Sequence, residues 1–344
     1  MNRIVISTTL TLAAFAPFAV GGQDLPDNSN PSPNRFSFGP TFGINLKADF
    51  HDNVYPPPAG GDANHYYNDG YVLVDNNNDN HAGFPLTTDW NFQNNSQYNP
   101  AGFGGSGAMQ FHAIQDSSSV TGNPQYGGEF IYQRVIGSLP FLCGHWGFEA
   151  GFGFTELDLR QSLSGTVPAI IDSYNLNGNF PGGPNFNPVV GTPGIAGNGV
   201  LLGDTPSRIN TSATLTGYQK LSGELFSLRL GPFAEWNLTR KLSLAASVGL
   251  TLAPAMVDYD FSETATVASD GAVINASGHS SKTKLLYGPY VGAMLRYDFN
   301  KCWGIYVGAR FQNLTDLNQS IGSRTARLDP GATVYGTVGV SWRF

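Results

Sequence analysis

Apolar and polar residues alternate along much of this chain, most clearly in residues 333–344. One parity of this segment holds Val334, Val338, Val340, Trp342 and Phe344, and the other holds mainly small or polar residues. A period of two places successive side chains on opposite faces of a strand. The segment is therefore predicted to be a strand with one apolar face and one polar face.

The same alternation recurs in seven further segments. They cover residues 36–50, 126–137, 146–155, 226–238, 242–252, 285–299 and 303–312, of which 126–137 alternates least regularly. Each has the length of about 9 to 11 residues or more that a tilted strand needs to cross a bilayer. The pattern predicts an all-β fold: a transmembrane, antiparallel, up-and-down β-barrel of eight strands. Ten to twelve strands are the alternative, if segments such as 70–75, 87–92 or 210–219 also cross the membrane.

The connections between these segments alternate in length. The short ones are 138–145, 237–241 and 300–302, and the long ones are 52–124, 161–208, 262–282 and 315–330. Short periplasmic turns and long extracellular loops are typical of bacterial barrels, so we expect large extracellular loops at about 52–124 and 161–208. Aromatic residues near the short turns are placed as an interfacial girdle: Trp146, Trp236, Tyr297, Phe299, Trp303, Trp342 and Phe344.

The N-terminus has the features of an export signal. Arg3 is followed by an apolar stretch, Ile4 to Val20, which ends in the small residues that precede a cleavage site. We expect residues 1–21 to be a cleaved signal peptide and residues 22–344 to form the barrel.

Composition narrows the possible functions. Charged residues make up 12% of the chain and its formal net charge is −7, with no cluster of Lys and Arg. Nucleic-acid binding needs concentrated cationic side chains, so that class is excluded. A soluble β-sandwich would also alternate, but its outer face would carry more Lys, Glu and Thr than the small, Gly-rich polar face predicted here.

The closing strand, Val334 to Phe344, resembles the C-terminal strand of bacterial outer-membrane β-barrels, and the chain as a whole is similar in pattern to the small OmpA-, OmpX- and OmpW-like barrel class. This resemblance implies location in the bacterial outer membrane, contact with its lipid, and recognition of Trp342 and Phe344 by the barrel assembly machinery. The segments 67–75 and 87–94 resemble part of uncharacterised exported barrel proteins, which implies no function.

Charged residues of the polar parity are predicted to face the lumen. They are Lys47, Asp49, Glu149, Arg229, Glu235, Arg296, Asp298, Arg310 and Arg343. Buried charges must be paired, so we expect them to form an ion-pair and hydrogen-bond network that fills the barrel. The alternative is a charged constriction that selects small ions, which would require a wider barrel.

Metal and catalytic motifs are incomplete. Asp75, Asn77 and Asp79 have the spacing that begins a Ca²⁺ loop, but Asn80 stands where the loop needs Gly. The histidines His51, His65 and His81 show no regular ligand spacing. His279 and Ser280 are adjacent, yet no third group or nucleophile elbow accompanies them. We therefore predict no catalytic, metal or cofactor site, and two free thiols, Cys143 and Cys302, in preference to a disulfide.

These observations predict a barrel with a structural or surface-interaction role and a lumen filled by side chains. Its partners would be lipid, the assembly machinery and, through the loops, a polysaccharide or surface protein. The first long loop is rich in aromatic residues that would contact such a partner or form a loop cap: Tyr66, Tyr67, Tyr71, Trp90, Phe92 and Tyr98. A porin-like channel for small solutes or ions is the alternative, and an outer-membrane enzyme is the third hypothesis.

Overall fold

The computed structural model of the protein describes residues 34–52, 54, 64–73, 86–87, 90–99, 107–122, 124–140, 144–177, 201–203 and 205–344. All of them belong to the unit Ser32–Phe344. The predicted signal peptide lies outside the described residues, as do Cys143, His81 and the Asp75–Asp79 segment. No helix among the described residues is long and apolar enough to cross a membrane.

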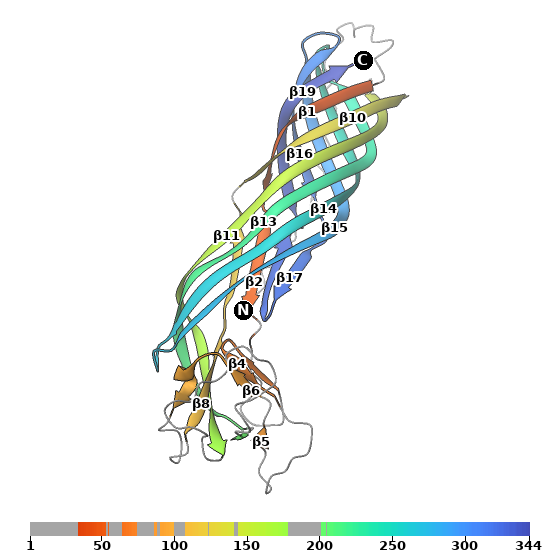
Figure 1. Cartoon of the computed structure of the whole chain (residues 1–344). Coiled ribbons are helices and arrows are strands. Elements are labelled where there is room, and N and C mark those ends of the chain that lie inside the picture. The colour runs from red at the N-terminus through yellow and green to blue at the C-terminus, as the bar shows by residue number, and fades with distance from the viewer. Residues whose placement is uncertain are drawn as a thin grey trace. The chain divides into compact units, whose positions relative to one another are not determined.

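Long strands of the described chain close a ring of antiparallel hydrogen-bonded pairs (Figure 1). In order around the ring, the eight strands are β1 (Asn34–Ile44), β10 (Gln125–Leu139), β11 (Gly144–Asn177), β13 (Ser207–Asn237), β14 (Leu242–Val267), β15 (Val273–Asp298), β16 (Trp303–Gln312) and β19 (Thr333–Arg343), which pairs again with β1. The prediction of an all-β antiparallel barrel is confirmed. Because the ring is closed, its backbone leaves no open sheet edge.

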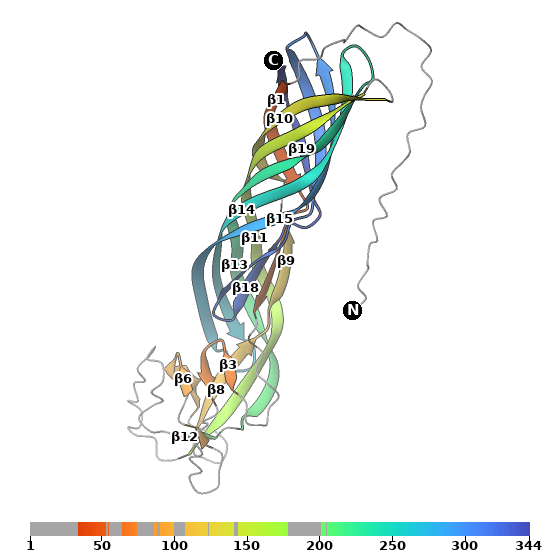
Figure 2. The same cartoon turned by 90° about the vertical axis from the view of Figure 1, so that its right-hand side faces the viewer.

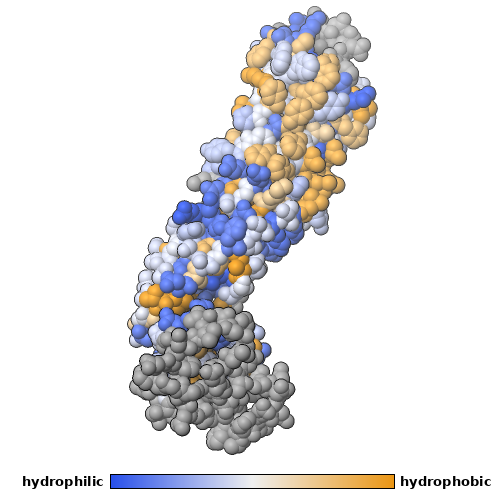
Figure 3. All heavy atoms as spheres, in the orientation of Figure 1, coloured by the Kyte–Doolittle hydropathy of each residue, from blue (hydrophilic) through white to orange (hydrophobic). Residues whose placement is uncertain are grey.

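The outer face of this ring is apolar, and Figure 3 shows part of the apolar surface. Each ring strand exposes large apolar side chains, among them Phe38, Phe130, Phe152, Leu230, Leu250, Val291, Val307 and Val338. The 11 residues of β19 rise about 3.3 Å each and, at a tilt of about 40°, span about 28 Å, close to the apolar band of a membrane barrel. The ring is therefore the membrane-spanning part of the protein.

Aromatic side chains mark the rim where the short turns lie. The ring centroids of Trp342 and Phe344 are 4.9 Å apart, and those of Trp303 and Trp342 are 6.2 Å apart. Phe36 stacks against Phe344 at 5.2 Å. Amphipathic rings collect at a membrane interface, so this cluster places one boundary of the bilayer at the short-turn rim.

Four ring strands are much longer than a bilayer requires. β11 has 34 residues, β13 has 31, and β14 and β15 have 26 each; the 34 residues of β11 extend about 110 Å along the strand. β11 and β13 stay paired as far as Ser173 and Ser207. The predicted extent of the long loops was therefore wrong: most of 161–177 and 262–282 is paired strand, because these strands continue beyond the apolar belt.

Four shorter strands continue the other half of the ring. β2 (Lys47–Asp52), β9 (Ser117–Thr121), β17 (Leu317–Ile321) and β18 (Arg324–Asp329) form a sheet in the order β17-β18-β2-β9. Ala48 and Phe50 of β2, with the preceding residue Leu46, share one buried cluster with Leu159 of β11 and Leu286 of β15. Beyond the belt the protein is thus a two-layer β-structure with a mainly apolar interior, which also holds the buried Arg324–Glu263 pair at 2.6 Å. The predicted loop 315–330 is largely a hairpin.

The polarity of the two strand faces reverses where the strands leave the belt. In β14, Val248, Leu250 and Leu252 face outward and are exposed, whereas Ala255 and Val257 face inward and are buried. The outer face of β14 contacts lipid at Val248, Leu250 and Leu252, and contacts water farther along the strand. The apolar residues therefore change from one parity to the other within a single strand.

A smaller structure, here called the cap, lies at the end of the long strands. β8 (Ala108–Ile114) pairs with the last part of β11, and β3 (His65–Tyr67), β4 (Gly70–Val72) and β6 (Trp90–Phe92) form a three-stranded sheet. Figure 2 shows β3, β6 and β8 close together at this end. The cap also contains β5 (Leu86–Thr87), η1 (Asn95–Gln97), β7 (Tyr98–Asn99) and β12 (Leu201–Gly203). The alternative of extra membrane strands at 70–75 and 87–92 is wrong for their described residues, which pair within the cap.

Candidate functional site

Buried charges fill the membrane-spanning part of the lumen. Near the short-turn rim, Glu235 of β13 accepts hydrogen bonds from Arg35 of β1 at 2.7 Å and Arg296 of β15 at 3.1 Å. Arg343 of β19 lies 2.8 Å from Asp298 and 3.8 Å from Glu235. Strands from different sides of the ring therefore supply one connected ion-pair group.

A second group lies around Glu129 of β10. Its Oε2 atom accepts hydrogen bonds from Arg229 of β13 at 2.8 Å and from Arg310 of β16 at 2.6 Å. The Arg310 guanidinium carbon also lies 4.8 Å from the ring centroid of Tyr335. The Glu129 side chain is 1% exposed, so both cations depend on this single carboxylate for charge compensation.

Gln133 extends the first group to Glu149. Its amide nitrogen donates to Glu149 at 2.8 Å, and its amide oxygen accepts from Arg296 at 2.9 Å. A cavity of about 30 Å³ lies among Glu129, Glu149 and Arg229. Several polar atoms beside it, including Glu129 Oε1, have no hydrogen-bond partner among the described residues, and a polar cavity of this size can hold water.

The structure brings seven of the nine predicted lumen charges together, namely Glu149, Arg229, Glu235, Arg296, Asp298, Arg310 and Arg343. Lys47 and Asp49 were wrongly placed in the lumen. They lie on β2, with side chains directed away from the interior that holds Leu46, Ala48 and Phe50. Asn45, which has a φ of 69°, breaks the strand between β1 and β2, so the parity that faces lipid in β1 faces the core in β2.

Three members of the network were not predicted. Arg35 precedes the alternating segment that begins at Phe36, and Glu129 and Gln133 belong to the segment with the least regular alternation. The parity of Glu129 and Gln133 indicated their place in the lumen, because both lie on the inward face of β10 with Ile131, between outward residues such as Phe130.

An apolar plug follows the lumen charges. Leu159, Leu221, Ala255 and Leu286 are fully buried against Phe50 from the facing sheet. These side chains occupy the interior of the described strands directly beyond Thr251, the last buried polar residue on the inner face of β14 before the plug.

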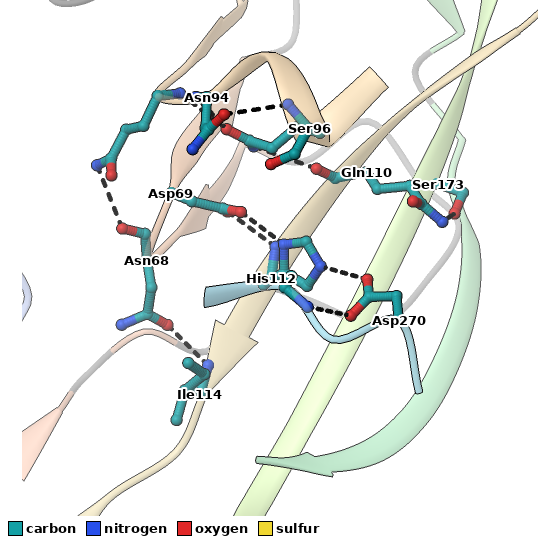
Figure 4. A network of polar contacts seen from close by, with 12 residues as sticks. Asn68, Asp69, Asn94, Ser96, Gln110, His112, Ile114, Ser173 and Asp270 are labelled. Carbon is teal, nitrogen blue, oxygen red and sulfur yellow. Dashed lines mark hydrogen bonds and ion pairs between the residues drawn. The ribbon is translucent and has the colours of Figure 1, made fainter. Parts of the chain in front are cut away.

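At the far end, His112 joins three separate segments (Figure 4). Its backbone N–H donates to Asp69 Oδ1 at 2.8 Å, its Nδ1 lies 2.5 Å from Asp69 Oδ2, and its Nε2 lies 2.8 Å from Asp270 Oδ2. Asp69 lies in the turn between β3 and β4, and Asp270 in the turn between β14 and β15. Burial opposes protonation of His112, but the two carboxylates outweigh it and raise the pKa of the imidazole above its ordinary value.

A second polar group holds the cap on β11. Arg208 donates to both oxygens of Asp172, at 2.7 and 2.6 Å, and the hydroxyl of Tyr67 donates to the same carboxylate at 2.6 Å. His65 stacks beside Tyr67 with ring centroids 6.2 Å apart, and burial lowers its pKa. Within the described part of the chain, no group of three or more His, Cys, Asp or Glu side chains could hold a metal ion.

The predicted loop aromatics have two different environments. Tyr67, Trp90 and Phe92 are buried in the apolar cluster of the cap, whereas Tyr66 is exposed. Most of this set therefore packs inside the cap rather than presenting a surface. Cys302 is a free, exposed thiol at the short-turn rim.

A cleft opens between the cap and the tip of the β14–β15 hairpin. It has a volume of about 170 Å³. Its cap side is lined by Asp69, Gln93, Asn94, Ser96, Gln97 and His112, and its hairpin side by Ala272, Val273, Ile274 and Asn275. Asp69 and His112 thus belong both to the lining and to the three-segment junction.

One Ser-His-Asp arrangement lies on the outer surface. His279 Nδ1 is 2.6 Å from Asp260 Oδ1, and its Nε2 is 3.3 Å from the hydroxyl of Ser281. The predicted neighbour Ser280 instead accepts a hydrogen bond from Gln319. Ser281 donates its proton to Asp258 at 2.5 Å, so its oxygen is not activated by the histidine, and the His279 side chain is 61% exposed.

Comparison with known proteins yields structural similarities of low score. No family model and no curated protein sequence matches the chain. Among solved structures, the attachment invasion locus protein Ail of Yersinia pestis, in complex with the heparin analogue sucrose octasulfate, is 10% identical, covers 90% of this chain and 99% of its own, and has a TM-score of 0.25. The outer membrane protease OmpT of Escherichia coli is 11% identical, covers 90% of this chain and 96% of its own, and has a TM-score of 0.30.

The class of the protein follows from its own architecture. A closed antiparallel ring, an apolar outer belt and an aromatic rim are the features of a bacterial outer-membrane β-barrel. The protein is a transmembrane β-barrel of the outer membrane, and among its described residues the buried lumen charges and the cap are candidate functional sites.

Proposed function

We propose that this protein is a non-conducting barrel that presents a β-structured head, made of the two-layer extension and the cap, outside the cell for surface interaction. The observation that carries the proposal is the continuation of four ring strands far beyond the apolar belt, with an interior that changes from charged to mainly apolar. A barrel needs no such extension to span a membrane.

The head is assigned to the extracellular side. The short connections 237–242 and 298–303 lie at the opposite rim, and Phe344 donates its backbone N–H to Asn34 at that rim. In bacterial barrels the short turns and the chain ends are periplasmic. The long strands then extend away from the cell.

The lumen chemistry supports a closed barrel rather than the porin-like alternative. Its cations share buried carboxylates, as Arg229 and Arg310 share Glu129, and a narrow barrel is generally filled by its own side chains. Beyond them, Leu159 and Leu286 contribute to an apolar core that would oppose the passage of ions.

Orientation is tested by labelling with a membrane-impermeant maleimide. In a Cys143→Ser/Cys302→Ser background, Ser262→Cys on the exposed face of the extension should react on intact cells. Thr239→Cys in a short turn is the matched control, and should react only after the outer membrane is permeabilised. The reverse pattern would refute the extracellular head.

Conductance is tested on the refolded full-length protein in planar bilayers. We expect no single-channel steps from protein whose folding is verified by heat-dependent migration on electrophoresis. A porin added to the same bilayer verifies that insertion can be detected. Reproducible steps from the folded protein would refute the closed lumen and favour a channel.

A further inference from the structure

We propose that the cleft between the cap and the β14–β15 hairpin binds a neutral saccharide. This inference rests on the proposed function, because it requires the head to face the outside of the cell. The chemistry of the two walls of the cleft indicates this ligand class.

Side-chain amides and a hydroxyl make up most of the cap wall, beside Asp69 and His112. Gln93, Asn94, Ser96 and Gln97 line it, and Asn94 and Ser96 are exposed to solvent. An amide both donates and accepts hydrogen bonds without carrying a charge, as does a hydroxyl. Such groups match the hydroxyls of a sugar, each of which also donates and accepts.

The hairpin wall is mostly apolar. Ala272, Val273 and Ile274 line it beside Asn275, and Val273 is 54% exposed. This apolar wall faces the polar cap wall across a cleft of about 170 Å³. A sugar ring has C–H faces and a hydroxyl edge, so it can contact both walls at once.

Charge excludes anionic sugars from this cleft. Asp69 lines it, and His112 lies between Asp69 and Asp270 at 2.5 and 2.8 Å. Even with His112 protonated, two carboxylates against one imidazolium leave a net negative charge. A sulfated or carboxylated sugar would be repelled, whereas a neutral saccharide would not.

The cap wall is held in place before any ligand arrives. Gln97 Oε1 accepts from the backbone N–H groups of Gln93 and Asn94, at 2.8 and 2.9 Å, and its amide nitrogen donates to the Gln110 carbonyl at 3.1 Å. Asn94 Oδ1 accepts from the Ser96 backbone N–H at 3.1 Å (Figure 4). A prearranged wall lowers the entropic cost of binding.

The test uses the refolded full-length protein in lauryldimethylamine oxide, a detergent without a sugar headgroup. The protein is applied to a panel of neutral gluco-, galacto-, manno- and N-acetylglucosamine oligomers. The same panel includes sulfated and carboxylated sugars. We expect binding to one or more neutral oligomers and none to the anionic sugars. Binding only to anionic sugars, or a blank panel, would overturn the inference.

Variants locate the binding. Asn94→Ala and Asn275→Ala each remove hydrogen-bonding groups from one wall and should weaken binding about five- to tenfold, the usual consequence of losing one hydrogen bond. Ser96→Trp should fill the cleft and abolish binding. Ser277→Ala, exposed on the same hairpin but outside the lining, is the matched control. Equal binding by all four variants would place the site elsewhere and refute the cleft.

The two proposals fail in distinguishable ways. If Ser262→Cys is labelled on intact cells while the glycan panel is blank, the saccharide inference fails and the extracellular head stands. If Ser262→Cys is protected while Thr239→Cys is labelled, the proposed function fails whatever the panel shows.

Discussion

Glu129→Gln is the sharpest test of the buried charge network. The substitution retains the size of the side chain and one oxygen acceptor but removes the charge that compensates both Arg229 and Arg310. The pairs lie at 2.8 and 2.6 Å, and the three side chains are 1 to 8% exposed. Breaking a buried ion pair by removing one partner costs about 3 to 5 kcal/mol, because the remaining charge stays buried.

The magnitude expected here lies near the lower end of that range. The cavity of about 30 Å³ beside Glu129 can admit water to the unpaired guanidinium groups, which reduces their desolvation penalty. We therefore expect Glu129→Gln to lower the free energy of unfolding by about 3 kcal/mol. Asp298→Asn is the internal comparison: its partner Arg343 is 19% exposed, so this loss should be about 1 kcal/mol.

The measurement is urea-induced unfolding of refolded protein in lipid vesicles, followed by tryptophan fluorescence. A double variant, Glu129→Gln/Arg229→Met, removes one of the two uncompensated cations and should recover part of the stability lost in the single variant. The stabilising role of the network is refuted if Glu129→Gln unfolds at the same urea concentration as the unaltered protein. It is also refuted if the loss of stability in the double variant equals the sum of the losses in the two single variants.

Three further predictions follow from the belt, the plug and the cap. Val248→Arg, on the lipid face, should lower the free energy of unfolding by about 2 to 4 kcal/mol, whereas Ser262→Arg on the same strand beyond the belt should cost little; equal losses in the same urea assay would refute the assigned boundary. Leu286→Ala should cost about 2 to 5 kcal/mol, because a fully buried side chain leaves a cavity in the plug; an unchanged urea midpoint would show that the plug is loosely packed. His112, whose folded pKa is raised, contributes stability that is complete below its ordinary pKa and is lost as pH rises through the folded pKa. Hydrogen exchange of the cap at pH 5 and pH 9 should therefore show faster opening of the cap at pH 9. His112→Asn should remove most of this difference, and the exposed residue His279, changed to Asn, is the control. An unaltered pH dependence in His112→Asn would show that other groups cause it.

Sequence periodicity was sufficient for the barrel class because it depends on local geometry. Alternation at Val334, Val338 and Val340 requires only that successive side chains point to opposite faces, and the structure places Val338 on the exposed face. The inward parity likewise identified Glu235, Arg296 and Arg310 as lumen candidates, because the side chain of a residue between two lipid-facing neighbours points into the lumen.

The length of the strands was missed although a signal was present. In β14 the apolar positions change from Val248, Leu250 and Leu252 to Ala253, Ala255 and Val257. A search for unbroken alternation ends the strand at that change of parity, whereas the backbone continues as a paired strand to Val267. Pro254 lies at this change of parity, yet the backbone continues through it as a strand, so the change reflects new surroundings of the strand rather than its end.

Alternation along the chain is sufficient to identify a membrane β-barrel and the lipid-facing side of each membrane strand, because both follow from the period of two. Which charges meet depends on the tertiary fold. Arg35, Glu235 and Arg296 are far apart in the chain and are brought together by ring closure, and the cleft at His112 exists only because the turns at Asp69 and Asp270 reach the same place. Such contacts depend on register and closure, which alternation alone leaves open.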